Sequence, residues 1–161
     1  MDLARSIARA VSDAGLTCAV AESVTGGHVS AHLAASPEAS EWFRGGVVAY
    51  SSAVKFEVLG VAPGPVVTAE CAQQMGTGVR ALLAGDVAVA TTGAGGPGPT
   101  EGQPAGTVFV AVETPARRAV HGYQFDGDPE QVVKRATLQA LRDLHAAAVQ
   151  TMEQIRRISP G

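Results

Sequence analysis

The sequence has few aromatic residues, few cysteines and no excess of basic charge. Aromatic side chains make up only 4% of the 161 residues, so small aliphatic residues such as alanine and valine must build the core. Cys18 and Cys71 are too few for a disulfide framework or a four-cysteine zinc site. The formal net charge of -3 argues against a general nucleic-acid binder, because such a protein needs a basic surface stripe.

Lysine is also scarce. Lys55 and Lys134 are the only lysines in a chain with ten arginines. A desolvated lysine can lose its proton, whereas an arginine in a protein cannot. Either lysine is therefore a candidate for acid–base chemistry, although composition alone favours the simpler interpretation that both lie on a solvated surface.

The balance of apolar and charged residues is that of a folded domain. Hydrophobic residues make up 46% of the chain and charged residues 17%, which predicts one domain over residues 1–161. The N-terminus begins an amphipathic pattern without the apolar segment of a secretion signal, and no stretch suits a membrane span. We therefore expect a cytoplasmic protein without membrane attachment, and both thiols reduced.

Hydrophobic periodicity predicts helices that alternate with strands, followed by a late strand pair and a long final helix. The expected helices cover 3–14, 25–35, 52–59, 68–83 and 128–155, with a helical turn at 38–43. The expected strands cover 17–21, 46–51, 86–92, 107–113 and 118–125. This order predicts an α/β fold, a three-layer α/β/α sandwich with a mixed, mostly parallel sheet.

Two glycine-rich turns, Ser23–Gly27 and Gly93–Gly98, follow predicted buried strands. Ligands of open α/β sheets bind beyond the carboxyl ends of the strands. Glycine allows the backbone to approach a ligand closely, and free N–H groups at a helix start can hold a phosphate or a developing oxyanion. Neither turn matches the Walker A or dinucleotide-binding spacing, and turns that only join two elements explain them equally well.

The segment Ala21–Gly27 (AESVTGG) resembles the A-E-S-x-T-G-G turn of the CinA C-terminal domain family, which includes stand-alone bacterial nicotinamide mononucleotide deamidases. The likeness continues over nearly the whole chain, in order and at compatible spacing. It covers Ser40–Ser51, Lys55, Leu59–Val61, Thr92–Pro97, Pro104–Val108 and Phe125–Asp128.

This resemblance implies an amidohydrolase that uses no metal or other cofactor and forms a homodimer. Such an enzyme converts the carboxamide of nicotinamide mononucleotide to a carboxylate and releases ammonia. A serine would attack the amide, and a partly buried lysine with a lowered pKa would take its proton. The resemblance places the catalytic groups on Ser23, Ser40, Tyr50 and Lys55, and a substrate-binding threonine on Thr92. We expect Thr25, Gly26 and Gly27, whose backbone N–H groups can stabilise the oxyanion, and Gly93 and Gly95 to complete the substrate-binding site.

Several of these roles have alternatives. Either Ser23 or Ser40 can be the nucleophile, and Tyr50 would orient Lys55 or relay a proton. Without the resemblance, Tyr50 is better interpreted as a strand residue that packs against a helix. Thr92 would bind substrate, or would be a polar strand end satisfied by the next turn.

The chain departs from the family pattern at Val24, where the family has cysteine, and at Pro129, where it has an arginine expected to hold the nucleotide phosphate. Lys134 or Arg135 could replace that arginine. If neither does, the substrate would lack the phosphate. A second alternative is a non-catalytic, nucleotide-binding or competence-associated module.

A pair of histidines offers a further candidate site. His28 and His32 lie four residues apart on a predicted helix, which is a spacing that two metal ligands can use. No acidic cluster lies near them in the sequence, so we expect exposed histidines and no metal.

Overall fold

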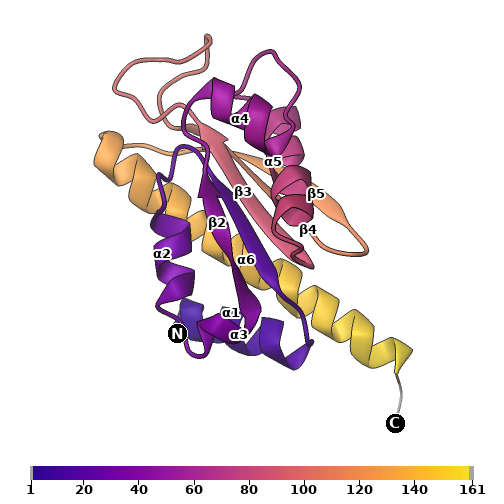
Figure 1. Ribbon diagram of the computed structural model, residues 1–161. Coiled ribbons are helices and arrows are strands. Elements are labelled where there is room, and N and C mark those ends of the chain that lie inside the picture. Colours follow the sequence, from indigo (N-terminus) through magenta and orange to yellow (C-terminus); the bar gives the residue numbers. More distant parts are fainter. Residues whose placement is uncertain (1, 160–161) are drawn as a thin grey trace.

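The computed structural model describes residues 2–159, which form a five-stranded sheet with helices on both faces (Figure 1). The helices are α1 (Leu3–Asp13), α2 (His28–Ala34), α3 (Ala39–Trp42), α4 (Ser52–Leu59), α5 (Ala69–Leu82) and α6 (Pro129–Ile158). The strands are β1 (Cys18–Glu22), β2 (Phe43–Val48), β3 (Val87–Gly93), β4 (Thr107–Glu113) and β5 (Arg118–Gln124).

The sheet has the strand order β2-β1-β3-β4-β5. Strand β1 runs parallel to β2 and β3, whereas β4 is antiparallel to both β3 and β5. The predicted three-layer α/β/α sandwich with a mixed sheet is therefore confirmed, and its pairings divide evenly between parallel and antiparallel. Because β1, β2 and β3 run in one direction, their carboxyl ends meet at one edge of the sheet.

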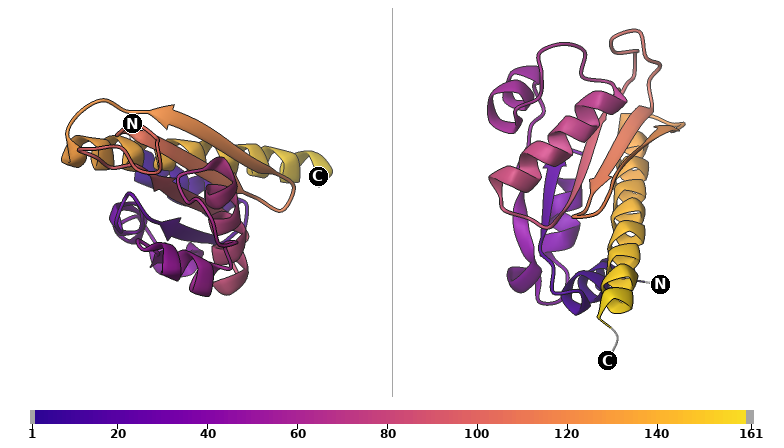
Figure 2. Two further views of the ribbon diagram at one scale, coloured as in Figure 1. Left: turned by 90° about the horizontal axis from the view of Figure 1, so that it is seen from above. Right: turned by 90° about the vertical axis from the view of Figure 1, so that its right-hand side faces the viewer.

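The two faces of the sheet carry different helices. Helices α1, α2 and α6 cover one face, and α4 and α5 cover the other (Figures 1 and 2). Along β1, Val20 belongs to the core under α1, α2 and α6, while Ala19 and Ala21 belong to the core under α4 and α5. The small alanine side chains let α5 pack closely on the sheet, which is how a core with few aromatic residues reaches normal density.

Helix α4 is fixed against α5 by a close backbone contact at Gly78. A Cβ atom on Gly78 would lie 1.9 Å from the backbone oxygen of Leu59, so only glycine fits there. Ser51 starts α4 as its N-cap, and its side chain accepts a hydrogen bond from the Val54 N–H group. These contacts set the position of Lys55 in the first turns of α4.

Strand β2 begins three residues earlier than predicted. The prediction placed a strand at 46–51, but the structure has Phe43–Val48, because Ser51 is used as the cap of α4. Gly46 lies inside the strand, and a Cβ atom there would be 2.0 Å from Ser30 Oγ of α2. Glycine therefore marks a close helix–strand contact here instead of a strand boundary.

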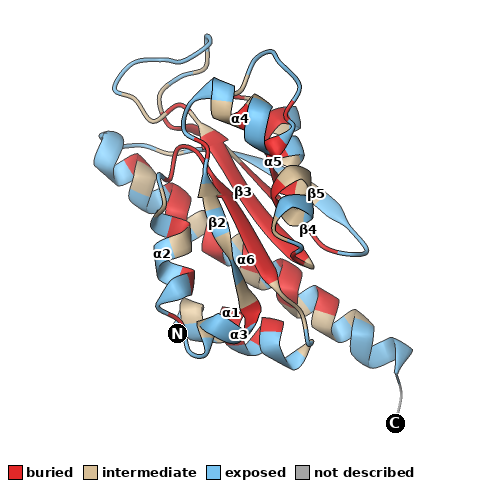
Figure 3. Ribbon diagram, viewed as in Figure 1, coloured by how far each residue is buried: buried red, intermediate tan, exposed pale blue. Residues whose placement is uncertain are grey.

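The sheet is buried along most of its length, and the outer faces of the helices are exposed (Figure 3). Helix α6 is longer at its C-terminal end than the prediction, and Ile158 at that end is 81% exposed. Between residues 2 and 159, no helix combines the length and the hydropathy that crossing a membrane requires.

Candidate functional site

Three candidate residues lie where the parallel strands end. Ser23 directly follows β1, Tyr50 lies two residues after β2, and Thr92 is the next-to-last residue of β3. The Ser23 N–H group donates to the backbone oxygen of Thr91 at 3.1 Å, so the parallel β1–β3 pairing extends one residue beyond β1. The structure therefore brings both glycine-rich turns to one edge of the sheet, as predicted.

The side chains of Ser23 and Thr92 share one face of the sheet. In the β1–β3 register Ala21 pairs with Ala90 and Glu22 with Thr91, which makes Ser23 the neighbour of Thr92. Because side chains alternate along a strand, both continue the rows of alanines under α4 and α5. No hydrogen bond among residues 2–159 involves the Ser23 hydroxyl, and Ser23 is 6% exposed.

Lys55 lies on this same face and is only 2% exposed. Its Nζ donates a hydrogen bond of 3.0 Å to the backbone oxygen of Tyr50, and none of the ion pairs in the described part of the chain includes it. Burial lowers the pKa of Lys55 below its ordinary value of 10.5, against smaller opposing effects of Cys71 and Glu101. The composition-based interpretation as a solvated lysine is wrong for Lys55, whereas Lys134 is exposed and pairs with Glu130 at 3.3 Å.

Cys71 and Glu101 are neighbours of Lys55 that sequence reasoning missed. Cys71 is 2% exposed, and burial raises its pKa while the charge of Lys55 lowers it. The Glu101 carboxylate accepts hydrogen bonds from the N–H groups of Val66 and Val67, the shortest at 2.6 Å. Cys71 lies in the first turn of α5 and Glu101 lies in an irregular loop, so no motif connects either residue to Lys55.

Thr92 forms a hydrogen bond with the loop that precedes α5. It is 1% exposed, and its hydroxyl donates to the backbone oxygen of Val66 at 2.7 Å. This partner belongs to the loop before α5 and not to the next turn that the second alternative named, and the Thr92 oxygen can still accept a hydrogen bond. A cavity of about 280 Å³ opens beside Cys71. It is lined by residues 61–65, Thr68, Glu70, Cys71 and Gln74.

Glu22 occupies the helix start that was expected to hold an anion. Its buried carboxylate accepts hydrogen bonds from the N–H groups of Gly27, Val29 and Ser30 at 2.9–3.2 Å. It also accepts a hydrogen bond of 2.6 Å from the Thr25 hydroxyl. Since a carboxylate of the chain itself already fills the N-terminus of α2, a substrate anion has no place there.

Other polar groups of the Ser23–Gly27 turn also have hydrogen-bond partners within the chain. The Gly26 N–H group donates to the backbone oxygen of Ser23, and the Thr25 side chain is fully buried and contacts Thr91 at 2.8 Å. Gly26, Gly27 and the Thr25 side chain therefore do not form the expected anion cradle. No hydrogen bond within residues 2–159 uses the N–H groups of Val24 and Thr25, which directly follow Ser23.

Gly93 and Gly95 are placed differently from each other. Gly93 pairs with Val108 in the β3–β4 ladder, and a Cβ atom on Gly93 would lie 2.6 Å from the backbone oxygen of Thr107. It is therefore a packing glycine. Gly95 lies next to Val24, since a Cβ atom there would be 3.7 Å from the valine side chain. Gly95 is thus the glycine of the second loop that borders the Ser23 turn.

Ser40 lies at the opposite end of the sheet. It is an exposed residue of α3, which precedes β2, whereas Lys55 follows the carboxyl end of β2. Six strand residues span about 20 Å, so the two side chains do not meet within one chain. Tyr50 is 73% exposed, and it orients Lys55 through its backbone oxygen, not its ring.

The expected substitutes for the missing arginine have internal partners. Arg135 donates to the backbone oxygen of Asp126, and Lys134 pairs with Glu130. Pro129 is the first residue of α6, and the Asp128 side chain caps that helix by accepting from the Gln131 N–H group at 2.9 Å. Acidic and capping groups therefore surround the position where the family arginine would stand.

His28 and His32 are both exposed and border a groove of about 360 Å³ between α2 and α6. The groove is also lined by Lys134, Thr137, Leu138 and Leu141. Among the residues that the structure describes, no group of three or more His, Cys, Asp or Glu side chains is arranged to hold a metal ion.

Known proteins resemble this chain over most of its length and share its fold. The sequence-family model of the CinA C-terminal domain matches residues 1–148 of this chain. A CinA-like protein of Syntrophotalea carbinolica is 39% identical over 96% of this chain. That alignment covers 36% of the relative, so the chain spans about a third of the length of the curated relatives that it matches.

Solved structures show the same likeness. A competence-damaged protein (CinA) superfamily protein of Klebsiella pneumoniae has a TM-score of 0.88 at 34% identity, covering 92% of this chain and 96% of its own. Competence damage-inducible protein A (ComA) of Klebsiella pneumoniae subsp. pneumoniae has a TM-score of 0.86 at 35% identity, covering 89% and 93%. The chain belongs to the CinA C-terminal domain family.

Proposed function

We propose that this domain hydrolyses a carboxamide to a carboxylate and ammonia, with nicotinamide mononucleotide as the first substrate to test. The observation that carries the proposal is Lys55, a buried lysine at the carboxyl ends of parallel strands, which has no ion pair with any of residues 2–159. Its lowered pKa makes the neutral amine more available as a base. Family membership and the position of Ser23 on the same face support the same reaction class.

In the proposed mechanism Ser23 is the nucleophile. The neutral Lys55 amine accepts the proton of the Ser23 hydroxyl, and Oγ attacks the amide carbon. The N–H groups of Val24 and Thr25 donate to the resulting oxyanion, as the residues after a nucleophile do in other strand-to-helix turns. The carbon–nitrogen bond then breaks, the Lys55 ammonium returns its proton to the leaving nitrogen, and ammonia departs. A water molecule, deprotonated by Lys55, then attacks the serine ester. The ester bond to Oγ breaks, the Lys55 ammonium returns its proton to Oγ, and the carboxylate departs.

The surroundings of α6 favour a second candidate substrate, which lacks the phosphate. Arg135 and Lys134 are engaged with Asp126 and Glu130, and Pro129 carries neither charge nor an N–H group. A phosphate at the start of α6 would meet the capping carboxylate of Asp128. The corresponding riboside avoids this repulsion.

Ammonia release from nicotinamide mononucleotide, nicotinamide riboside and free nicotinamide tests both candidates. Faster turnover of the nucleotide than of the riboside supports the nucleotide, and turnover of the riboside at an equal or higher rate supports the substrate without phosphate. No turnover of any of the three, combined with thermal stabilisation by one of them, would favour a binding module over an enzyme.

A further inference from the structure

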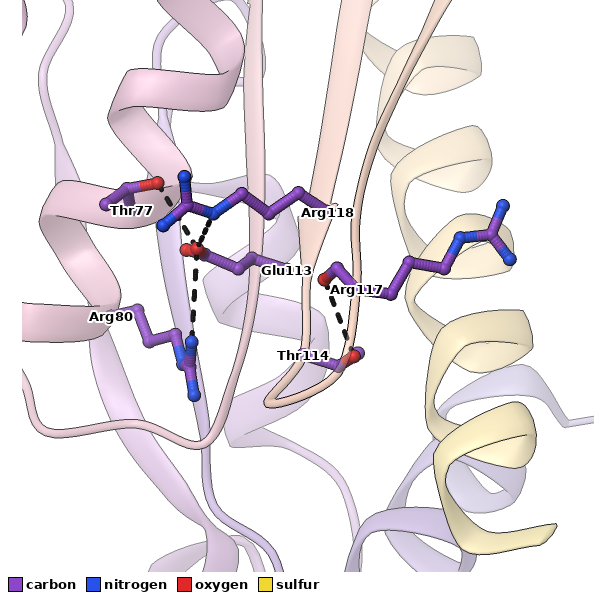
Figure 4. Close-up of polar contacts among 6 residues, drawn as sticks. All are labelled: Thr77, Arg80, Glu113, Thr114, Arg117 and Arg118. Carbon is purple, nitrogen blue, oxygen red and sulfur yellow. Dashed lines mark hydrogen bonds and ion pairs between the residues drawn. The ribbon is translucent and has the colours of Figure 1, made fainter. Parts of the chain in front are cut away.

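A second polar cluster lies at the end of the sheet opposite Lys55. It joins Thr77 and Arg80 of α5, Glu113 at the end of β4 and Arg118 at the start of β5 (Figure 4). These residues line a groove of about 300 Å³ together with Ala81 and Gly85. None of them belongs to the proposed catalytic site.

Glu113 is the buried centre of the cluster, at 4% exposure. Its Oε1 accepts hydrogen bonds from Arg118 Nε at 2.6 Å and from the Thr77 hydroxyl at 3.3 Å. Its Oε2 is buried and has no hydrogen-bond partner among the described residues. A buried carboxylate oxygen without a donor is costly, so this atom points to a missing partner.

Arg80 is the side chain with donors to spare. Its NH1 lies 3.9 Å from Glu113 Oε1, which is an ion-pair contact but too long for a hydrogen bond. The Arg80 side chain donates no hydrogen bond within the described residues. This side chain is 30% exposed, and that of Arg118 is 59% exposed. With two guanidinium groups and one carboxylate, the groove has a formal charge of +1.

We propose that this groove binds an oxyanion that carries its own hydroxyl group at neutral pH, of the inorganic phosphate class. Arg80 and Arg118 donate to the charged oxygens, since a planar guanidinium suits phosphate. The Arg80 side chain, which no hydrogen bond holds, turns aside, and the ligand hydroxyl then donates to Glu113 Oε2. This contact supplies the donor that the buried carboxylate lacks.

The buried carboxylate also determines which oxyanions fit. At neutral pH hydrogen phosphate keeps one proton and can donate to Glu113, whereas sulfate has no proton and meets a negative oxygen. The groove therefore prefers phosphate to sulfate, although the two anions are similar in size. A site made only of surface arginines would not separate them in this way.

Isothermal titration with inorganic phosphate, and with sulfate at matched ionic strength, tests the proposal on the whole chain. Arg80→Gln is the main variant, because its side chain makes no hydrogen bond that the fold needs. Arg117→Gln is the matched control, since this neighbouring arginine donates to Gln150 of α6 and does not line the groove. Glu113→Gln tests the choice of anion, and circular dichroism checks the fold of each variant.

We expect one phosphate per chain, binding about tenfold more weakly in Arg80→Gln and unchanged in Arg117→Gln. The preference for phosphate over sulfate should disappear in Glu113→Gln, because an amide can donate to sulfate. Absence of phosphate binding, equal binding by Arg80→Gln and Arg117→Gln, or equal affinity for both anions in the unaltered chain would overturn the proposal. Ser23→Ala should bind phosphate normally, so the result is independent of the proposed hydrolysis.

Discussion

The amine of Lys55 donates a hydrogen bond of 3.0 Å to the backbone oxygen of Tyr50, while the Tyr50 residue itself is 73% exposed. The acceptor is a neutral carbonyl group. This carbonyl oxygen can accept a hydrogen bond from the neutral amine or from the ammonium. Unlike a carboxylate, it has no negative charge to offset the charge of the ammonium. The fold thus buries Lys55 where desolvation lowers its pKa and makes the neutral form easier to reach than in an exposed lysine.

Lys55→Arg should abolish hydrolysis, because a guanidinium cannot lose its proton. If Lys55 is the general base, we expect the rate of ammonia release to fall by about 10²–10⁴-fold. Lys134→Arg is the matched control, since Lys134 is an exposed lysine in a surface ion pair, and its activity should be unchanged. A Lys55→Arg protein that folds and retains most of its activity would remove Lys55 from the mechanism.

Lys55→Met should stabilise the fold at neutral pH and lose this advantage in alkali. The pKa of Lys55 is lower in the folded chain than the ordinary 10.5, so the unfolded chain binds more protons between these two pKa values. Burial of the charged form therefore costs stability below the folded pKa, and the cost falls as pH rises toward 10.5. It amounts to about 1.4 kcal/mol for each pH unit between the two pKa values.

Thermal unfolding of both proteins from neutral pH to pH 10 measures this difference, to which Cys71 also contributes because the Lys55 charge lowers its pKa. Because the chain has only two lysines, ¹³C-labelled lysine gives one pair of side-chain signals whose titration can be followed directly. A Lys55 signal that titrates at or above the ordinary lysine value of 10.5 would contradict the expected lowering.

Ser23→Ala and Ser40→Ala should separate the two candidate nucleophiles. We expect Ser23→Ala to remove activity and the trapped serine ester seen by mass spectrometry. Ser40 lies at the other end of β2, so Ser40→Ala should retain both if one chain contains the whole site. If Ser40 acts from a second copy, as the proposed homodimer would allow, mixing the two inactive variants should restore activity, and sedimentation should show the dimer.

Glu22→Gln should destabilise the domain, because the buried carboxylate accepts hydrogen bonds from three N–H groups and one hydroxyl. An amide at this position brings its own NH₂ group toward those donors, and we expect a loss of about 2–4 kcal/mol in the free energy of unfolding. Glu57→Gln, at an exposed position of α4, should change it by less than about 0.5 kcal/mol. Urea denaturation of both variants measures the difference, and equal midpoints would show that Glu22 does not hold α2.

Sequence reasoning predicted the layers because apolar periodicity reports which side of each element is buried. It placed β1, β3 and β4 within one residue of their bounds. It misplaced β2 because glycine is locally ambiguous, and Gly46 is required by the Ser30 side chain of a different element. Contacts between distant segments leave no periodic signal that a single sequence can show.

The sequence alone determined that an alanine- and valine-rich chain with regular strand and helix periods would form an α/β sandwich, and its motifs pointed to Ser23, Lys55 and Thr92. Only the tertiary structure decided how these residues are used. The register of β1 and β3 places Ser23 beside Thr92. The N–H groups at the N-terminus of α2 bind the Glu22 carboxylate instead of a ligand. The packing of α4 on α5 shields Lys55 from solvent. The reason is physical: desolvation and hydrogen-bond competition depend on which groups meet in space, and those groups are far apart along the chain.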